Sequence, residues 1–95
     1  MPELNESEAI GIVREYFRKP GVAAVEIIRG RLKVGDNVRF HGHTTDFTQR
    51  IDSMQVNHKD IPEAGAGDYV GILVAERVRQ NDRMFLEGGD PGVAL

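Results

Sequence analysis

The segment from His41 to Asp46 holds the side chains best suited to bind a metal ion. His41 and His43 are two residues apart, so both imidazoles would point to the same side of a strand, and Asp46 follows closely. A closed zinc site needs four ligands, however, and the third histidine of the chain, His58, is distant in sequence. The alternative is a pair of exposed histidines at a strand end, partly protonated near neutral pH. We expect this alternative, without metal or other cofactor.

Catalytic groups are not gathered at any point of the sequence. Ser7 and Ser53 have no neighbouring histidine and no Gly-x-Ser-x-Gly setting, and the chain has no cysteine to serve as a nucleophile. The phosphate-binding pattern Gly-x-x-x-x-Gly-Lys-Ser/Thr is also missing, so we expect neither binding nor hydrolysis of GTP. The sequence therefore predicts a protein that is not an enzyme.

Positive charge is concentrated in the first half of the chain. Residues 14–50 hold eight lysines and arginines against four acids, whereas residues 51–95 hold four against eight, and the net charge is −3. Such charges can simply solvate outer strand faces, but arginine, lysine and threonine are also the usual contacts to RNA phosphates. Few aromatic residues are present to stack on bases, which favours structured over single-stranded RNA. The candidate RNA-binding residues are Arg29, Arg31, Lys33, Arg39, His41, His43, Thr44, Thr45 and Arg50.

These residues must be positioned by strands, because apolar residues alternate with polar ones and glycines and prolines separate the alternating segments. In residues 22–29 the pattern places Ala23, Val25 and Ile27 in the core. No segment has the periodicity of an amphipathic helix. The predicted strands are 10–17, 22–29, 37–41, 47–58 and 69–75, with a loop at 59–68 and a sixth strand within residues 78–86, which include a turn at Asn81-Asp82.

Three of these strands carry further predictions. The apolar phase changes within 47–58, which predicts a β-bulge near Asp52-Ser53. Residues 69–75 are apolar on both faces, which predicts a strand covered on both sides. Residues 78–86 repeat the pattern of residues 32–40, with Asn81 in place of Gly35, since asparagine also tolerates positive φ.

Two motifs resemble a known family. Gly30–Val38 (Gly-Arg-Leu-Lys-Val-Gly-Asp-Asn-Val) is similar to the second, β-barrel domain of translational GTPases such as elongation factor Tu. Ala64–Ile72 (Ala-Gly-Ala-Gly-Asp-Tyr-Val-Gly-Ile) is similar to the Ala-Gly-x-x-Val-Gly segment of that domain. The resemblance runs from about Ile10 to Glu87. It implies an all-β fold, a small closed six-stranded antiparallel β-barrel. The GTPase domain that usually precedes this barrel is expected to be missing, because the sequence has no phosphate-binding pattern.

The resemblance also implies partners. In that family this barrel contacts ribosomal RNA or the acceptor end of transfer RNA, so we expect structured RNA or the ribosome to bind here. The barrel also packs on the GTPase domain, so the alternative is a protein-interaction module that docks on a GTPase-like or other protein, or on itself. A continuous positive patch would favour RNA, whereas exposed Tyr69, Leu73 or Phe85 would favour docking.

The expected organisation is a lead-in at residues 1–9, one barrel domain at 10–87 and a tail at 88–95. The acidic N-terminal segment lacks the apolar core of a signal peptide, and the apolar runs are too short to cross a bilayer. A cytoplasmic location without membrane contact is therefore expected.

Overall fold

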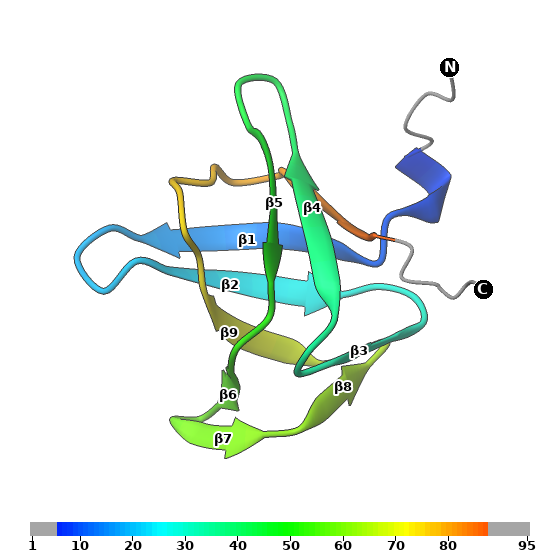
Figure 1. Ribbon diagram of the computed structural model, residues 1–95, viewed down its shortest axis with the longest axis vertical. Coiled ribbons are helices and arrows are strands. Elements are labelled where there is room, and N and C mark those ends of the chain that lie inside the picture. Colours follow the sequence, from blue (N-terminus) through cyan, green and yellow to red (C-terminus); the bar gives the residue numbers. More distant parts are fainter. Residues whose placement is uncertain (1–5, 88–95) are drawn as a thin grey trace.

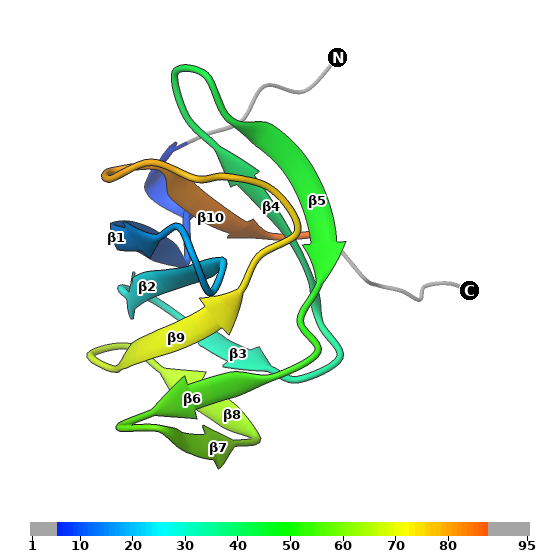
Figure 2. The same ribbon diagram turned by 90° about the vertical axis from the view of Figure 1, so that its left-hand side faces the viewer.

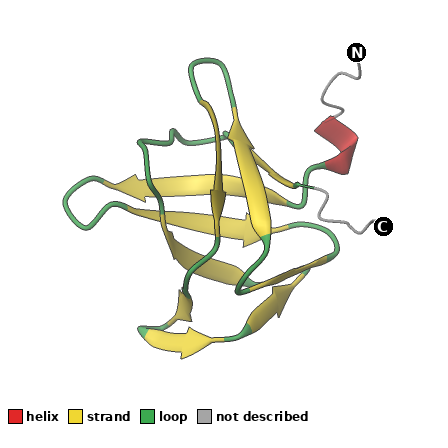
Figure 3. Ribbon diagram, viewed as in Figure 1, coloured by secondary structure: helices red, strands yellow, loops and turns green. Residues whose placement is uncertain are grey.

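The computed structural model describes residues 6–87, which form ten strands and one short 3-10 helix (Figures 1 and 3). The predicted tail and residues 1–5 of the predicted lead-in lie outside the described residues. Within the described range no helix is long and apolar enough to cross a membrane. The elements are η1 Glu6–Glu8, β1 Gly11–Phe17, β2 Val22–Ile27, β3 Arg31–Lys33, β4 Asn37–His41, β5 Asp46–Arg50, β6 Met54–Val56, β7 Lys59–Ile61, β8 Glu63–Gly65, β9 Tyr69–Leu73 and β10 Arg83–Leu86.

Eight strands form one antiparallel sheet in the order β5-β4-β10-β1-β2-β9-β6-β7, and β3 pairs with β8 in a separate ribbon. The sheet curls around a common interior (Figure 2). Gln49 of β5 bridges the seam to β9, because its amide nitrogen donates to the carbonyl of Leu73 at 2.9 Å and its amide oxygen accepts from the N–H of Ala75 at 2.7 Å. The predicted all-β barrel fold is confirmed. The number of strands and the closure differ from the prediction. The structure describes ten strands instead of six, and the edge strands β5 and β7 of the large sheet are not paired with each other.

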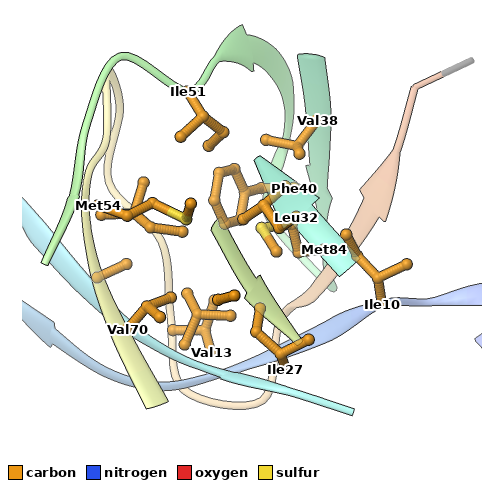
Figure 4. Close-up of a cluster of buried hydrophobic side chains, with 14 of the residues drawn as sticks. Ile10, Val13, Ile27, Leu32, Val38, Phe40, Ile51, Met54, Val70 and Met84 are labelled. Carbon is orange, nitrogen blue, oxygen red and sulfur yellow. The ribbon is translucent and has the colours of Figure 1, made fainter. Parts of the chain in front are cut away.

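Apolar side chains fill the interior of the curled sheet (Figure 4). The ring of Phe40 stacks on Phe47 with the centroids 5.3 Å apart. Ala23, Val25 and Ile27 are fully buried, which confirms the alternation predicted for this strand. Burial of a large apolar side chain contributes about 1.5–3 kcal/mol, so this core supplies the main driving force for folding. The largest fully buried side chains are Phe40, Ile27, Leu32, Ile51, Met54, Ile72, Met84, Val13, Val25, Val38 and Val78.

The turn that leads into β4 occurs three times in the described chain. In residues 33–36, 65–68 and 79–82, the N–H of the last residue donates to the carbonyl of the first at 3.0 Å. The carboxylate of the final aspartate accepts from the N–H of the first residue at 2.9, 2.9 and 2.8 Å, respectively. The third position has a positive φ, for which glycine and asparagine are best suited. These residues are Gly35, Gly67 and Asn81, with φ of 101°, 99° and 76°.

The predicted repeat of residues 32–40 in residues 78–86 is therefore confirmed at the turn. The two segments differ at their last residues, Phe40 and Leu86. Phe40 is fully buried, whereas its counterpart Leu86 is 46% exposed. Leu86 is the last residue of β10 and lies at the rim of the barrel, where it lines a surface hollow instead of the core.

Residues 47–58 form two strands instead of one bulged strand. β5 ends at Arg50 and pairs with β4, whereas β6 begins at Met54 and pairs with β7 and β9. The predicted change of phase is present, since Ile51 and Met54 are both fully buried. It is produced by three residues outside any strand, so a bulge near Asp52-Ser53 is not needed. A strand that changes its pairing partner can reset its phase at the break.

The predicted loop at residues 59–68 is wrong, because this segment contributes β7 and β8. β7 pairs with β6 across a two-residue turn at Asn57 and His58, whose φ of 54° and 66° are typical of a type I′ hairpin. β8 pairs with β3. Both strands are three residues long and mostly exposed, so they lack the apolar alternation by which strands are recognised in a sequence.

Candidate binding surfaces

The nine residues predicted to bind RNA come from three strands and the adjoining loops. Arg31 and Lys33 lie on β3, Arg39 and His41 on β4, and Arg50 at the end of β5. Arg29 precedes β3 and donates to the backbone carbonyl of Ser7, and His43, Thr44 and Thr45 connect β4 to β5. Thr45 is buried, whereas the other eight are exposed or half-exposed.

Three of the five lysines and arginines in this predicted patch contact a carboxylate. The pairs are Arg31–Glu63, Arg39–Asp46 and Arg50–Asp52. Arg39 makes two hydrogen bonds to Asp46, from Nε and from one terminal nitrogen, both at 2.8 Å. The Arg50 pair is looser, with 3.7 Å between nitrogen and oxygen. The paired acids reduce the positive potential that the predicted patch presents to a ligand.

The Arg39–Asp46 pair stays charged at neutral pH. The hydrogen bonds from Arg39, helped by its charge, hold the pKa of Asp46 below its ordinary value of 3.8. The same hydrogen bonds raise the pKa of the Arg39 guanidinium. Arg39 is therefore neutralised by its partner at any pH near 7.

His41, His43 and Asp46 do not come together as a group that could bind a metal ion. Among the side chains that the structure describes, in residues 7–87, no three of histidine, aspartate or glutamate are placed to hold one ion. His41 is the cross-strand partner of Asp46, whereas His43 is exposed in the loop that follows β4.

A further group of arginines lines a hollow between the end of β1 and the loop that joins β9 to β10. Val78 is buried and anchors this loop, and Arg77 and Arg79 flank it with exposed side chains. The pairing of β1 with β2 is irregular at Arg14, which is left out of the register. The hollow has a volume of about 490 Å³. We call it the arginine groove, and its lining residues are Arg14, Glu15, Tyr16, Arg18, Arg77, Val78, Arg79 and Gln80.

Backbone hydrogen bonds hold the loop against β1. The N–H of Asn81 donates to the carbonyl of Val13 at 2.7 Å, and the N–H of Val13 donates to the carbonyl of Asp82 at 2.8 Å. Figure 1 shows the loop running beside β1 towards β10. The groove is therefore built on fixed backbone.

The arginines of the groove differ in their partners. Arg14 is bound to Glu26 by two hydrogen bonds of 2.6 and 2.8 Å. Among the described side chains, those of residues 7–87, no carboxylate lies in ion-pair contact with Arg18, Arg77 or Arg79. These three guanidinium groups are available to an anion.

A second hollow of about 550 Å³ adjoins the arginine groove and shares Arg79 and Gln80 with it. Its acid, Asp82, is buried and turned inward, where its carboxylate accepts from the N–H of Arg79 at 2.8 Å. Gly42 lies so close that a Cβ there would be 1.8 Å from Oδ1 of Asp82. The lining residues are His41, Gly42, His43, Arg79, Gln80, Asn81, Asp82 and Arg83.

The outer side of β2 and β9 carries apolar residues. Across these strands Val22 faces Leu73 and Ala24 faces Gly71. The exposed fractions of Tyr69, Leu73 and Phe17 are 59%, 57% and 44%, respectively. Much of this side borders a hollow of about 760 Å³. We call this side of the sheet the apolar face. Its residues are Phe17, Val22, Ala24, Tyr69, Gly71 and Leu73.

The prediction that residues 69–75 are covered on both sides is wrong for the described chain. Val70 and Ile72 point into the core and are buried, but Tyr69 and Leu73 point away from it and are exposed. No element of residues 6–87 packs over them. Phe85, the third apolar residue considered for docking, is buried.

The same fold occurs in two crystal structures of the C-terminal domain of a Geobacillus thermoleovorans protein described as a U32 peptidase. One has a TM-score of 0.81 and 24% identity, and the match covers 92% of this chain and all of that chain. The other, a selenomethionine variant, has a TM-score of 0.77 and 26% identity, with 82% and 98% covered. The folds of the two domains are thus closely similar.

Curated relatives are longer proteins. An uncharacterised protease of Methanocaldococcus jannaschii is 38% identical over 78 residues, which cover 81% of this chain and 19% of the protease. A collagenase of Porphyromonas gingivalis is 32% identical over 72 residues, which cover 75% of this chain and 20% of the collagenase. The chain therefore spans about a fifth of the length of these relatives.

A family model also matches this chain. That model, elongation factor Tu domain 2, matches residues 21–84, which is more than half of the chain and includes both sequence motifs. Together with the barrel described above, this match shows that the chain belongs to the elongation factor Tu domain 2 family.

Proposed function

We propose that the chain is a non-catalytic docking module whose apolar face packs against the remainder of a longer, protease-type polypeptide. The observation that carries this proposal is the exposure of Tyr69 and Leu73 on the outward side of β9. The outward position between them is Gly71, so this side of the strand has no charged or amide side chain. The outward side of an antiparallel sheet is usually polar when it faces water. A cover over this face would complete the burial on both sides that the sequence of the strand predicts.

The energy available from such a cover is considerable. Burial of a large apolar side chain contributes about 1.5–3 kcal/mol, so Tyr69, Leu73 and Phe17 could together contribute several kcal/mol to docking. The small residues Ala24 and Gly71 keep the floor of the hollow low, which leaves room for a partner side chain to enter. An exposed apolar surface of this kind is typical of interaction sites.

The size of the relatives supports the choice of partner. The matched region is about a fifth of the M. jannaschii protease and of the P. gingivalis collagenase, so most of each relative lies outside this domain. The solved G. thermoleovorans chains consist of the domain alone, which supports a fold that is complete without the rest of the protein. The apolar face, which the domain itself leaves uncovered, is then accessible to the part of the longer polypeptide that lies outside this domain.

Single-cysteine labelling tests this proposal, because the chain has no cysteine of its own. Leu73→Cys is prepared in the isolated chain and in a chimera in which this chain replaces the matching domain of the M. jannaschii protease. The rate of maleimide labelling at this position is followed by mass spectrometry of the proteolytic peptide. We expect labelling to be at least about tenfold slower in the chimera, since the thiol reacts only when the interface opens.

The matched control is Thr48→Cys, at an exposed position of β5 whose cross-strand partner is Arg39 of β4 and which is not among the residues of the apolar face. It should label at the same rate in both proteins. Equal rates for Leu73→Cys in both proteins would overturn the docking proposal. Slow labelling of Leu73→Cys in the isolated chain at high concentration alone would indicate that a second copy is the partner instead.

We propose RNA binding as a second candidate function, favoured by the three arginines of the groove that have no acidic partner among the described residues. The patch predicted from the sequence remains a candidate surface, but there an RNA would compete with Glu63, Asp46 and Asp52 for the arginines. A binding titration with total transfer RNA tests this function. Failure to bind at low salt would contradict it.

A further inference from the structure

We infer that the arginine groove is the surface that binds the phosphodiester backbone of structured RNA, an inference that rests on the second candidate function. The groove presents Arg18, Arg77 and Arg79 from two chain segments that lie far apart in sequence and meet at the end of β1. Guanidinium groups bind phosphate oxygens through paired, charge-assisted hydrogen bonds. Three of them around one hollow form a binding site for a polyanion.

Availability distinguishes the groove from the predicted patch. Arg18, Arg77 and Arg79 make no ion pair with the side chains of residues 7–87, so a phosphate can bind them without displacing one of these carboxylates. In the predicted patch a phosphate must first break the bond of Arg31 to Glu63 or the two bonds of Arg39 to Asp46. For an equal number of arginines, the groove therefore attracts a phosphate more strongly than the predicted patch does.

The neighbouring hollow extends this surface. The two hollows share Arg79 and Gln80 in their linings, so they lie next to each other, with volumes of about 490 and 550 Å³. The second hollow adds Arg83, whose guanidinium is held by a hydrogen bond of 2.7 Å to the carbonyl of Asn81. It also adds His41 and His43 as further donors. Two adjacent hollows lined with arginines suit consecutive phosphates of a chain better than a single free phosphate.

The acids of the lining do not cancel this charge. Two carboxylates line the two hollows, Glu15 and Asp82, against Arg14, Arg18, Arg77, Arg79 and Arg83. Asp82 is buried and points into its own turn, so it is not exposed to a ligand in the groove. Arg14 is neutralised by Glu26. Glu15 is then the one exposed carboxylate of the lining, against the four arginines Arg18, Arg77, Arg79 and Arg83.

The groove suits an RNA backbone better than unpaired bases. Tyr16 is the one aromatic residue of its lining, and Tyr16 packs against the hydrophobic core. Single-strand binding relies on exposed aromatic rings on which successive bases stack. Structured RNA is instead recognised through its shape and its sugar-phosphate edge, for which a rigid arginine-lined depression is sufficient.

Two triple variants test the inference with the same change of charge. The first carries Arg18→Ala, Arg77→Ala and Arg79→Ala in the groove. The matched control carries Arg31→Ala, Lys33→Ala and Arg50→Ala in the predicted patch. Affinities for total transfer RNA and for polyuridylate are measured by fluorescence anisotropy over a series of salt concentrations. Thermal unfolding of all three proteins verifies that the exposed substitutions leave the fold intact.

The groove variant should lose on the order of tenfold or more in affinity for transfer RNA, and its salt dependence should flatten by roughly two to three units. The control should lose less than about threefold, since two of its three cations, Arg31 and Arg50, are already paired with carboxylates and only Lys33 is not. Wild type should bind transfer RNA more tightly than polyuridylate. A loss confined to the control would overturn the groove and favour the predicted patch, with RNA binding itself retained. Absence of binding by wild type would overturn both the inference and the second candidate function, and a preference for polyuridylate would overturn the choice of structured RNA.

Discussion

Replacement of Gly42 by alanine should destabilise the fold, because the carboxylate of Asp82 occupies the space that a Cβ would need. A Cβ on Gly42 would lie 1.8 Å from Oδ1 and 2.6 Å from Cγ of Asp82. Asp82 is 4% exposed, and its other oxygen accepts from the N–H of Arg79 at 2.8 Å. The side chain therefore has to move, and it loses this hydrogen bond when it does.

The expected magnitude combines two effects. Overpacking of a filled site costs about 1–3 kcal/mol. The lost hydrogen bond to a charged acceptor costs about 1.5–3 kcal/mol. Because displacement of Asp82 relieves part of the overlap, the two costs are not fully additive, and we expect the free energy of unfolding to fall by about 2–4 kcal/mol. For a domain of this size that corresponds to roughly 10–25 °C in Tm.

Urea unfolding of a double-mutant cycle tests the reasoning. In the background Asp82→Ala the obstructing carboxylate is gone, so Gly42→Ala should cost less than about 1 kcal/mol there. Gly35→Ala is the matched control, since nothing lies within 4 Å of its Cβ position and its cost should be the same in both backgrounds. If Gly42→Ala costs as much without the Asp82 carboxylate as with it, the steric explanation is wrong.

Three further predictions follow from the turns and the ion pairs. Gly35→Asn should destabilise the chain less than Gly35→Ala, which should cost about 1–2 kcal/mol in urea unfolding, because φ is 101° there; equal costs would contradict this. Since the pKa of Asp46 is lowered in the folded state, its pair with Arg39 stabilises the fold above the unfolded pKa, and this contribution is lost as pH falls through the folded value. The difference in unfolding free energy between wild type and Asp46→Asn should thus be constant above about pH 5 and shrink in acid, whereas a pH-independent difference would refute the assignment. Glu26→Gln should release Arg14 and raise the affinity for transfer RNA by a few-fold at low salt, while unchanged anisotropy titrations would show that Arg14 does not contribute.

The fold could be predicted from the sequence wherever a strand has one buried and one exposed side. The alternation at Ala23, Val25 and Ile27 reflects such a strand, and all three are buried. The Gly35-Asp36 turn could be predicted because a positive φ and a short acceptor side chain are needed there. β7 and β8 could not, since short polar strands are held by pairing with distant segments and carry no local signal.

The candidate sites are harder to predict than the fold, because charges interact through space and the balance of charge along a sequence does not show which of them are paired. Residues 14–50 have a positive balance, but four of their six arginines are paired with acids. Residues 51–95 have a negative balance that conceals Arg77 and Arg79. The alternation of these arginines around Val78 was a usable signal, since a buried apolar residue between two exposed cations places both on one surface.

Arg14 connects the two proposed surfaces. It lines the arginine groove, while its guanidinium is bound to Glu26 and lies beside Tyr69 of the apolar face. Glu26 is the cross-strand partner of Tyr69, and its side chain is still 24% exposed in the described chain. A protein that covers Tyr69 would reduce this exposure and raise the cost of leaving Glu26 without a partner. Docking should therefore hold Arg14 on Glu26 and away from a phosphate, and by linkage bound RNA should weaken docking to the same extent.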